Sequence, residues 1–511
     1  MTVQQDFLTI AVPMRDQTEW NGLGLADIER ALESLGNPAN PDLARRLRQT
    51  GIVHFLSLHA IAADEPGKPA HLLIEATVDG TAADATPAIA AALGEALLPI
   101  LRLSNGIERI EQVLPLLEKH RFALTAAPWH TRAKLTGLPF NGLPGLTVRA
   151  IRENRLIAWH ARKTIRQERR KNSTLGPQSL FGTAAQRLDR IIAQPSMNAR
   201  ARLLFSETAR APWLPIEQSK GLIAAGFKTL WAARQLLALT VLLPWLIIVA
   251  GLWLSKVPLL GALSAAIAPA LAAAIILAAL LAWLLARDEA ANTPVDRTPS
   301  PRNLAAISLR ENAPGVVQNH MISVTRLRAA PIRRLSLSLA FNAIATMARL
   351  GLMRAGFLST IGTIHAARWL VLPGTRQLVF VSNYGGSWES YLEDFITKSA
   401  RGVTGVWSNT EGFPTTNLLF WKGSEDGDRM KRFARCSMKP TAFWFSAYPD
   451  LAAATIRKQA LIVSGLICRK RLAASPSDAE AWLDLFGTIP RPDYGLQYGE
   501  IQTLMFGGLR R

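Results

Sequence analysis

Two uncharged apolar stretches in the middle of the chain constrain its fold more than any other feature. They cover residues 236–254 (LLALTVLLPWLIIVAGLWL) and 259–285 (LLGALSAAIAPALAAAIILAALLAWLL), with only four residues between them. The shorter stretch would span about 29 Å as a helix, close to the thickness of a bilayer's hydrocarbon core. Since a four-residue break permits only a tight turn, the pattern predicts a transmembrane helical hairpin at 236–286. A helix pair buried in a soluble core would be expected to show a polar face.

Cations on both sides of this hairpin set its expected orientation. They are Lys220, Lys228 and Arg234 before it and Arg287, Arg297 and Arg302 after it. The turn contributes only Lys256. Because cytoplasmic flanks of membrane helices are enriched in Lys and Arg, we expect a multi-pass protein of an inner (cytoplasmic) membrane, with both termini in the cytoplasm. Neither stretch holds an ionisable residue, so the hairpin is expected to anchor the protein rather than to form an ion path.

The overall charge points to a lipid partner. The 511-residue chain carries a formal net charge of +20. A Lys or Arg beside an acidic leaflet gains about 1 kcal/mol, so a bilayer with anionic lipids is the expected partner. The sequence shows no zinc-finger spacing and no RNA-binding signature, and we expect no nucleic-acid partner. With only Cys436 and Cys468, it offers neither a disulfide framework nor a thiolate centre, and no metal site is expected.

Matching segments indicate an internal duplication. LLIEATVDG at 72–80 matches LVFVSNYGG at 378–386, LTVRAIRENRLI at 146–157 matches LAAATIRKQALI at 451–462, and IVHF at 52–55 matches TIHA at 363–366. The members of each pair lie 305–311 residues apart. Chance matches would not keep so nearly one offset, so we interpret the flanks of the hairpin as two copies of one unit.

The order of elements in the second copy predicts its fold. Apolar periodicity indicates a strand at 377–384, a helix at 387–398, strands at 402–408 and 417–421, a helix at 426–435 and a strand at 441–448. This βαββαβ order is the ferredoxin-like arrangement. We therefore predict an α+β protein with two tandem ferredoxin-like repeats that can close into a pseudo-dimeric α/β barrel, with the transmembrane hairpin inserted between them.

These patterns divide the chain into eight segments. They are an N-terminal extension (1–50), a first ferredoxin-like repeat (51–163), basic amphipathic helices (164–235), the transmembrane hairpin (236–286), a linker (287–334), an interfacial amphipathic helix (335–360), a second ferredoxin-like repeat (361–471) and a C-terminal tail (472–511). The interfacial helix contains Arg349, which would be costly in the middle of a bilayer, so we expect that helix at the membrane surface.

Polar and aromatic residues gather at one end of the strands of the second copy. The predicted ligand-binding residues are Asn383, Ser387, Trp388, Glu389, Trp407, Asn409 and Glu411. Ser387 is a suitable N-cap, and the N–H groups of a helix N-terminus favour an anionic or carbonyl ligand. Polar groups among aromatic side chains are the usual composition of a small-molecule site. The alternative is a capped helix whose aromatic residues pack a core, and the sequence alone leaves both interpretations open.

Two histidines, His54 and His365, occupy matching positions at the start of matching strands. One interpretation makes either of them a haem ligand, and the other makes both of them ordinary strand histidines. The chain has no P-loop, GxGxxG, HExxH or Ser–His–Asp motif, so no catalytic residue is assigned.

Four segments of the second copy are distinctive as motifs. They are IHAARWLVLPG (364–374), VFVSNYGGSWESYLEDFI (379–396), GVWSNTEGFP (405–414) and WFSAYPDL (444–451). They resemble a family of bacterial membrane proteins that occur joined or adjacent to dye-decolorising-type peroxidase modules. The closing EIQTLMFGGLRR (500–511) is similar to the opening stretch of such a module. The resemblance implies an α/β-barrel relative of the peroxidase and chlorite-dismutase superfamily, whose haem enzymes use a proximal His and a distal Asp or Arg. No residue here is matched to those positions.

Three functional hypotheses follow. The leading one is an accessory or ligand-binding protein, anchored in the membrane and facing the cytoplasm, that handles an apolar or amphipathic small molecule for a peroxidase-type redox partner. The second is a haem-dependent peroxidase-like oxidoreductase with His365 or His54 as axial ligand, and the third is a non-catalytic membrane scaffold. The sequence names neither the ligand nor a reaction, and it is compatible with an oligomer.

Overall fold

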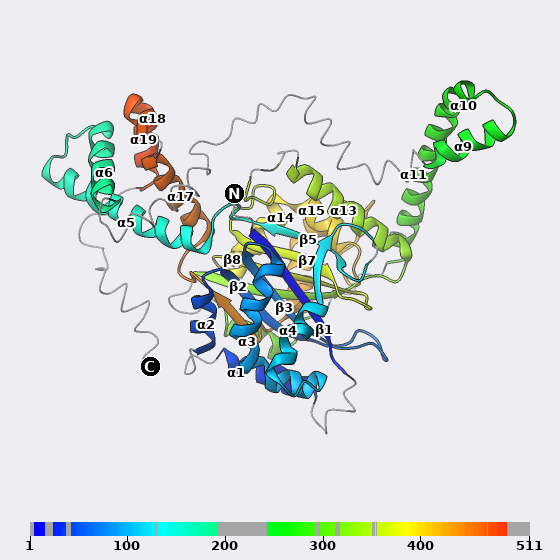
Figure 1. The fold of residues 1–511 in the computed structure, drawn as a ribbon. Coiled ribbons are helices and arrows are strands. Elements are labelled where there is room, and N and C mark those ends of the chain that lie inside the picture. The colour runs from blue at the N-terminus through cyan, green and yellow to red at the C-terminus, as the bar shows by residue number, and fades with distance from the viewer. Residues whose placement is uncertain are drawn as a thin grey trace.

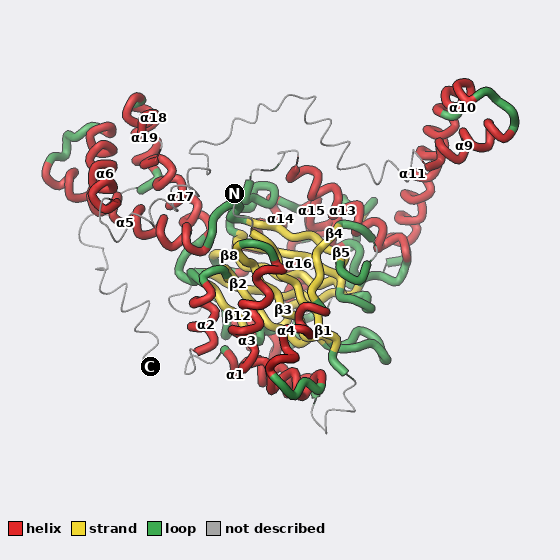
Figure 2. The backbone as a smooth tube through the Cα atoms, in the orientation of Figure 1, coloured by secondary structure: helices red, strands yellow, loops and turns green. Residues whose placement is uncertain are grey.

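One ten-stranded sheet forms the centre of the molecule (Figure 1, Figure 2). The computed structural model describes residues 5–15, 24–36, 42–128, 130–192, 243–292, 297–311, 317–349, 353, 355–467 and 469–487. The strands lie in the order β11-β6-β8-β7-β5-β4-β1-β3-β2-β12. Their bounds are β1 (Gln5–Pro13), β2 (Val53–Ile61), β3 (His71–Asp79), β4 (Arg121–Thr125), β5 (Lys134–Asn141), β6 (Gln318–Arg326), β7 (Ile364–Val371), β8 (Gln377–Gly385), β11 (Met438–Lys439) and β12 (Phe443–Ser446). The predicted α+β class is confirmed.

Both faces of this sheet are buried, which explains why its strands are apolar almost throughout. Successive side chains of a strand point to opposite faces. In β3, Leu72 and Ile74 pack under the helices of the first half. Leu73, between them, packs on the other face with Leu370 and Val379 of β7 and β8. That second face encloses an interior shared by both halves of the chain, which we call the lumen.

The sheet curls until its two ends approach each other. β11 and β12 stand at opposite ends of the strand order, yet only three residues separate them in the chain. Ser446 Oγ of β12 donates a hydrogen bond to Gln318 Oε1 of β6 at 2.8 Å. The ring of Trp444 lies 6.2 Å from that of His320, again between β12 and β6. β12, the last strand in the order, therefore lies close to β6, the second strand. This contact closes the lumen on this side.

The two halves of the chain contribute equivalent sets of strands. The first half lies in the order β4-β1-β3-β2, and the second half lies in the order β11-β6-β8-β7. Each half also supplies one strand to the edge of the other, because β5 pairs with β7 and β12 pairs with β2. The matching sequence segments fall on equivalent elements: β2 and β7, β3 and β8, and the helices α5 (Val148–Lys171) and α17 (Ala453–Ile467).

Helices cover the outer face of each half. The first half carries α1 (Leu25–Leu35), α2 (Asp42–Thr50), α3 (Ala82–Asn105), η2 (Ile110–Gln112) and α4 (Val113–Lys119). The second half carries α13 (Pro331–Arg349), α14 (Trp388–Lys398), α15 (Ala400–Trp407), η4 (Gly423–Glu425) and α16 (Gly427–Ser437). Local chemistry sets their limits, as α3 shows. Thr81 accepts a hydrogen bond from the backbone N–H of Asp84 at its start, and Gly106 takes a φ of 68° at its end.

A helical bundle stands beside the sheet (Figure 1). It consists of α5, α6 (Pro177–Ile192), α17, α18 (Arg469–Ala474) and α19 (Pro476–Asp484). Phe181 and Trp482 meet edge to face at its centre, with ring centroids 5.1 Å apart. The indole N–H of Trp482 donates to Ile462 O at 3.0 Å, which satisfies the only polar atom of that buried ring.

Three apolar helices project from the body (Figure 1). They are α9 (Leu243–Leu254), α10 (Leu259–Ala265) and α11 (Ile267–Ala290), and we call them the apolar arm. In the described chain, two helical stretches are long and apolar enough to span a membrane, Ala82–Asn105 and Leu259–Ala290. The first is α3, a core helix whose apolar window is 50% buried, whereas only 11% of the second window is buried. Among the described residues, Leu259–Ala290 is therefore the one candidate membrane segment that is largely exposed. Residues 236–242 of the predicted span 236–254 lie outside the described residues.

The strand predicted at 402–408 is wrong, because these residues belong to helix α15. Val403, Val406 and Trp407 are spaced three and four residues apart and form one buried helical face. The strand predicted at 417–421 is reduced to the ends of a small hairpin, β9 (Thr416–Asn417) and β10 (Trp421–Lys422).

Two predicted membrane-side segments take part in the body. The predicted interfacial helix, 335–360, overlaps α13, whose Leu337 and Phe341 are fully buried against the second half. The predicted linker, 287–334, contains α12 (Pro301–Ser308) and the whole of β6. The strands β1 and β6 begin the two equivalent sets, although both precede the predicted repeats.

A close backbone approach at Gly142 joins the two halves. Its N–H donates to His365 O at 2.9 Å, and a Cβ built at this glycine would overlap the carbonyl oxygen of Ile364. Gly142→Ala should therefore lower the free energy of unfolding by about 1–3 kcal/mol, because a packed backbone must move. The denaturant midpoint of the detergent-purified chain measures this. Gly182→Ala is the control, since its methyl group would meet open space. Equal losses for both variants would contradict the prediction.

Candidate functional site

The predicted ligand residues lie in separate surroundings. Asn383 faces the lumen, where its Oδ1 accepts a hydrogen bond from Trp444 Nε1 at 2.8 Å. Asn409 is fully buried near α13 and α15, and its amide donates to Gly405 O at 2.9 Å. Trp407 packs in the core of the second half. Each of these polar or aromatic groups is occupied by contacts within the fold.

Three other predicted residues stand together at the start of α14. Ser387 Oγ accepts from the backbone N–H of Ser390 at 3.3 Å, so it caps the helix as expected. The guanidinium of Arg435 lies 3.6 Å from the ring centre of Trp388 and 3.3 Å from the carboxylate of Glu389. An arginine thus covers the position expected for a ligand. The seventh residue, Glu411, lies apart from these and lines a groove of arginines.

His54 and His365 occupy equivalent β-bulges. The register of β2 on β3 shifts at His54, and the register of β7 on β8 shifts at His365. His54 is fully engaged, with Nε2 2.8 Å from Asp79 Oδ1 and Nδ1 2.6 Å from the hydroxyl of Tyr448. Neither ring nitrogen of His54 is therefore open to a metal.

The surroundings of His365 are tight and apolar. Neither of its ring nitrogens has a hydrogen-bond partner among the described residues. The rings of Phe55 and Tyr448 lie 5.5 Å and 6.4 Å from its ring. Burial, and then the positive charge of Arg457, lower the pKa of His365 to about 3, so the ring is neutral. A haem needs an open slot beside its axial nitrogen, and this packing does not fit one.

A buried ion pair that the sequence analysis missed crosses the lumen. Arg368 Nη2 of β7 lies 2.8 Å from Glu75 Oε2 of β3, and both side chains are about 1% exposed. Arg368 also donates to Leu8 O and Ala76 O, while Ser57 Oγ donates to Glu75 Oε1. Burial alone would raise the pKa of Glu75, but the charge of Arg368 lowers it to about 2. Both partners are therefore charged, and together they tie the two halves across the interior.

Two histidines extend this polar layer. The rings of His59 and His320 stack at 5.2 Å with an angle of 14° between their planes. His59 Nε2 lies 2.7 Å from Ser57 Oγ. Burial, with a smaller effect from His320, lowers the pKa of His59 to about 3. The layer is filled by its own side chains, so we interpret it as a structural network rather than a ligand site.

A cavity of about 500 Å³ lies beneath α13 on the outer face of the second half. Its apolar lining includes Ile344, Met347, Leu358, Phe395 and Val403. Trp369 of β7 forms part of the wall and is only 2% exposed, and its Nε1 has no hydrogen-bond partner among the described residues. Lys398 and Arg401 also line the cavity. The cavity combines an apolar volume with one unused N–H donor and two cations.

This arrangement suits binding better than catalysis. The lining has no carboxylate, histidine or cysteine that could serve as a base or nucleophile. In the described chain, no group of three or more His, Cys, Asp or Glu side chains is placed to hold a metal ion. No local sequence pattern marks the cavity, because its walls come from α13, β7, α14, α15 and the loop before β7.

No family model, no curated protein and no solved structure matches the chain. The resemblance to proteins associated with dye-decolorising-type peroxidase modules, and the partner that it implies, stay predictions.

Proposed function

We propose that the protein is a membrane-attached binding protein that holds a small amphipathic molecule in the cavity beneath α13. The observation that carries this proposal is the buried indole of Trp369, whose N–H lacks an acceptor in the wall of an apolar cavity. A buried polar group without a partner costs about 1–3 kcal/mol, and a ligand oxygen beside Trp369 would recover that energy. The volume falls within the usual range of small-molecule sites, about 300–1,000 Å³.

The two cations in the lining refine the ligand class. Lys398 and Arg401 stand at the junction of α14 and α15, and the rest of the lining is largely apolar. Lys398 also pairs with Asp394, and the guanidinium of Arg401 lies 4.5 Å from the ring centre of Trp421. Such a site suits an apolar chain or ring system that carries one carboxylate or another anionic group near Arg401. Peroxidase-type chemistry in a partner protein remains compatible with this role, because the cavity itself offers no catalytic group.

We further propose that the apolar arm is the membrane hairpin at 236–286, with both flanks in the cytoplasm. Its helices expose large apolar side chains, including Leu260, Ile275 and Trp283. Trp245 Nε1 donates to Leu263 O at 3.2 Å, which joins α9 to the helix that follows it. In the same proposal the two strand sets are ferredoxin-like repeats, since each lies in the order fourth, first, third, second strand, and the hairpin is inserted between them.

A fatty-acid titration tests the cavity. Radiolabelled dodecanoate, added to the detergent-purified chain, should bind in a 1:1 ratio. Met347→Trp fills the mouth of the cavity and should abolish binding. Trp369→Phe keeps the ring but removes the N–H donor, and it should weaken binding about two- to tenfold, the worth of one hydrogen bond.

Leu304→Trp is the matched control, because Leu304 and Met347 are both 37% exposed and only Met347 lines the cavity. Dodecanoate binding that survives Met347→Trp would refute the cavity as the site. Binding that Leu304→Trp reduces as strongly as Met347→Trp would refute it as well.

A further inference from the structure

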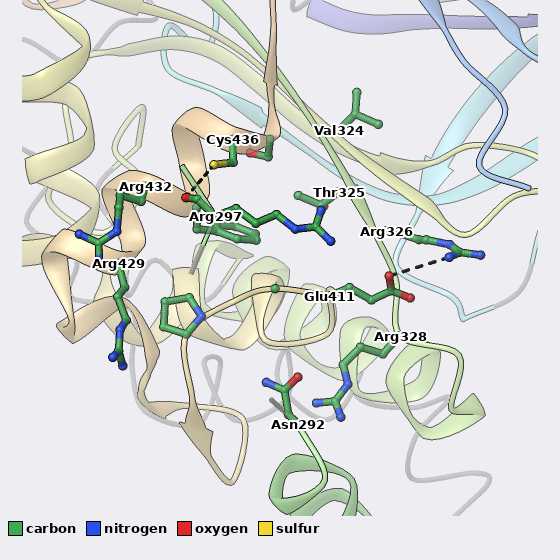
Figure 3. A pocket seen from close by; sticks show the side chains of 14 residues that line it. Asn292, Arg297, Val324, Thr325, Arg326, Arg328, Glu411, Arg429, Arg432 and Cys436 are labelled. Carbon is green, nitrogen blue, oxygen red and sulfur yellow. Dashed lines mark hydrogen bonds and ion pairs between the residues drawn. The ribbon is translucent and has the colours of Figure 1, made fainter. Parts of the chain in front are cut away.

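A second cavity, of about 560 Å³, has five arginines in its lining (Figure 3). Its charged side chains are Arg297, Arg326, Arg328, Arg429, Arg432 and the single carboxylate Glu411. The arginines come from the segment after α11, the end of β6 and the helix α16. We call this cavity the arginine groove. Like charges repel, so a convergence of five guanidinium groups around one open space requires a physical reason.

Carboxylates beside the groove are shared rather than matched one to one. Glu65 lies within 3.0 Å of both Arg326 and Arg376. Glu411 is shared by the same two arginines, at 3.9 Å and 3.4 Å. These two carboxylates therefore balance the charges of Arg326 and Arg376 in one compact cluster, apart from the arginines of α16.

A third carboxylate is shared in the same way. Asp288, at the end of α11, lies 3.1 Å from Arg328 and 2.5 Å from Arg333. Burial, and then the charge of Arg333, lower the pKa of Arg328. On α16, Arg429 lies 3.5 Å from Asp426 and is half exposed. The lining itself therefore combines five arginines with one carboxylate, and further carboxylates lie just behind it.

This charge suits a phosphate. Guanidinium groups bind phosphate oxygens through paired N–H donors, and such charge-assisted hydrogen bonds are roughly twice as strong as neutral ones. The groove also contains Val324, Pro414 and Phe433, which give it an apolar side. Its volume exceeds what a single phosphate group requires, so a phosphate attached to an organic residue fills it better.

The place of the groove in the fold indicates the source of that phosphate. Asn292 lines the groove only two residues after the end of the apolar stretch Leu259–Ala290. Glu289 fixes this junction to the body, because its carboxylate accepts from the backbone N–H groups of Leu418 and Leu419 at 2.7 Å and 2.8 Å. If α11 lies in a bilayer, the groove stands at the depth of the phospholipid headgroups.

An apolar loop beside the same junction strengthens this placement. Leu418, Phe420 and Trp421 are exposed at the tip of the β9–β10 hairpin. Leu418 and Leu419 take φ values of 47° and 71°, a conformation that residues other than glycine rarely adopt. The hydrogen bonds to Glu289 hold this strained tip in place. Exposed Trp and Leu next to cations are typical of membrane interfaces.

We infer that the arginine groove binds the phosphate of an anionic phospholipid headgroup. The inference rests on the proposed membrane attachment for the source of the phosphate, while the choice of a phosphate follows from the groove itself. The lipid would hold the body against the leaflet at the base of α11.

Calorimetric titration of the detergent-purified full chain tests the inference. Dihexanoyl phosphatidylglycerol should bind saturably, and dihexanoyl phosphatidylcholine, with the same chains and no net charge, should bind at least tenfold more weakly. The double variant R429Q/R432Q should lower the affinity for phosphatidylglycerol at least tenfold. R30Q/R45Q is the control, since it removes the same charge from exposed arginines of α1 and α2 that, like Arg429, pair with an aspartate three residues earlier.

The outcomes separate the two proposals. Equal affinity for both lipids, or unchanged affinity in R429Q/R432Q, would overturn the inference. Pyrophosphate that bound more tightly than phosphatidylglycerol, with the same dependence on Arg429 and Arg432, would support a phosphate site and overturn its lipid source. Met347→Trp should leave phosphatidylglycerol binding unchanged, so a failure of the cavity proposal is seen independently in the dodecanoate titration.

Discussion

Glu75→Ala should lower the free energy of unfolding by about 3–5 kcal/mol, because it leaves a guanidinium buried without its counter-charge. Arg368 is 1% exposed, and an arginine does not release its proton at ordinary pH. The other hydrogen-bond acceptors of Arg368 are the carbonyl oxygens of Leu8 and Ala76 and the hydroxyl oxygens of Thr9 and Thr77, which carry only partial charges. Denaturant unfolding of the detergent-purified chain at pH 7 measures the loss.

A double-mutant cycle separates the ion pair from the packing around it. Glu75→Ala combined with Arg368→Met removes both charges and should be more stable than Glu75→Ala alone. The control is Glu153→Ala, which breaks an exposed pair with Arg149 on α5 and should cost less than about 0.5 kcal/mol. Strictly additive losses in the cycle would show that Glu75 and Arg368 do not interact.

Acid should destabilise the protein strongly between pH 6.5 and pH 4. Burial is the first cause that lowers the pKa of His59 to about 3, of His71 to about 4 and of His365 to about 3. In the unfolded chain these rings titrate near pH 6.5. Inside this window the unfolded state therefore binds more protons, so stability falls as the pH falls, by up to about 1.4 kcal/mol per pH unit for each histidine.

The quantity to compare between variants is the slope of the free energy of unfolding against pH, rather than the free energy itself. His365→Leu removes one of the titrating groups and should reduce the slope, even if the variant is less stable overall. Arg45→Gln, on the exposed face of α2, should leave the slope unchanged. The unfolded chain protonates Glu75 near pH 4.5, whereas the folded protein keeps this charge down to about pH 2, so the stability that Glu75 contributes is lost mainly below this window. A flat response between pH 6.5 and pH 4 would contradict the neutral buried histidines.

The fold was predictable where sequence periodicity reports burial directly. The matches of 72–80 with 378–386 and of 146–157 with 451–462 fall on equivalent elements. Residues 402–408 are predicted as a strand, although their apolar residues Val403, Val406 and Trp407 follow helical spacing, because periodicity over only seven residues does not separate a strand from a helix. β6 falls in the predicted linker because its polar residues, such as Gln318 and His320, obscure the strand pattern although they face the lumen rather than solvent.

The buried ion pair and the arginine groove were harder to predict, because neither of them depends on residues that are close together in the sequence. Glu75 and Arg368 are isolated charges in otherwise apolar strands, and a lone charge of each sign in such strands was the available signal for a buried pair. The arginine groove is assembled from three distant segments, so the sequence shows only scattered cations. Glu411 is predicted as a binding residue for its place after the strand expected at 402–408, and it lines the groove as the one carboxylate among arginines.

The exchange of β5 and β12 has a consequence for synthesis. β5 ends at Asn141, and its partner strand β7 begins at Ile364, 223 residues later. At about 5–20 residues per second, the ribosome needs roughly 11–45 s to deliver that partner. During this interval the first half has an unpaired strand edge, and the apolar arm leaves the ribosome before the edge can be covered. The newly made chain must therefore accommodate the apolar arm, its most apolar segment, before its central sheet can be completed.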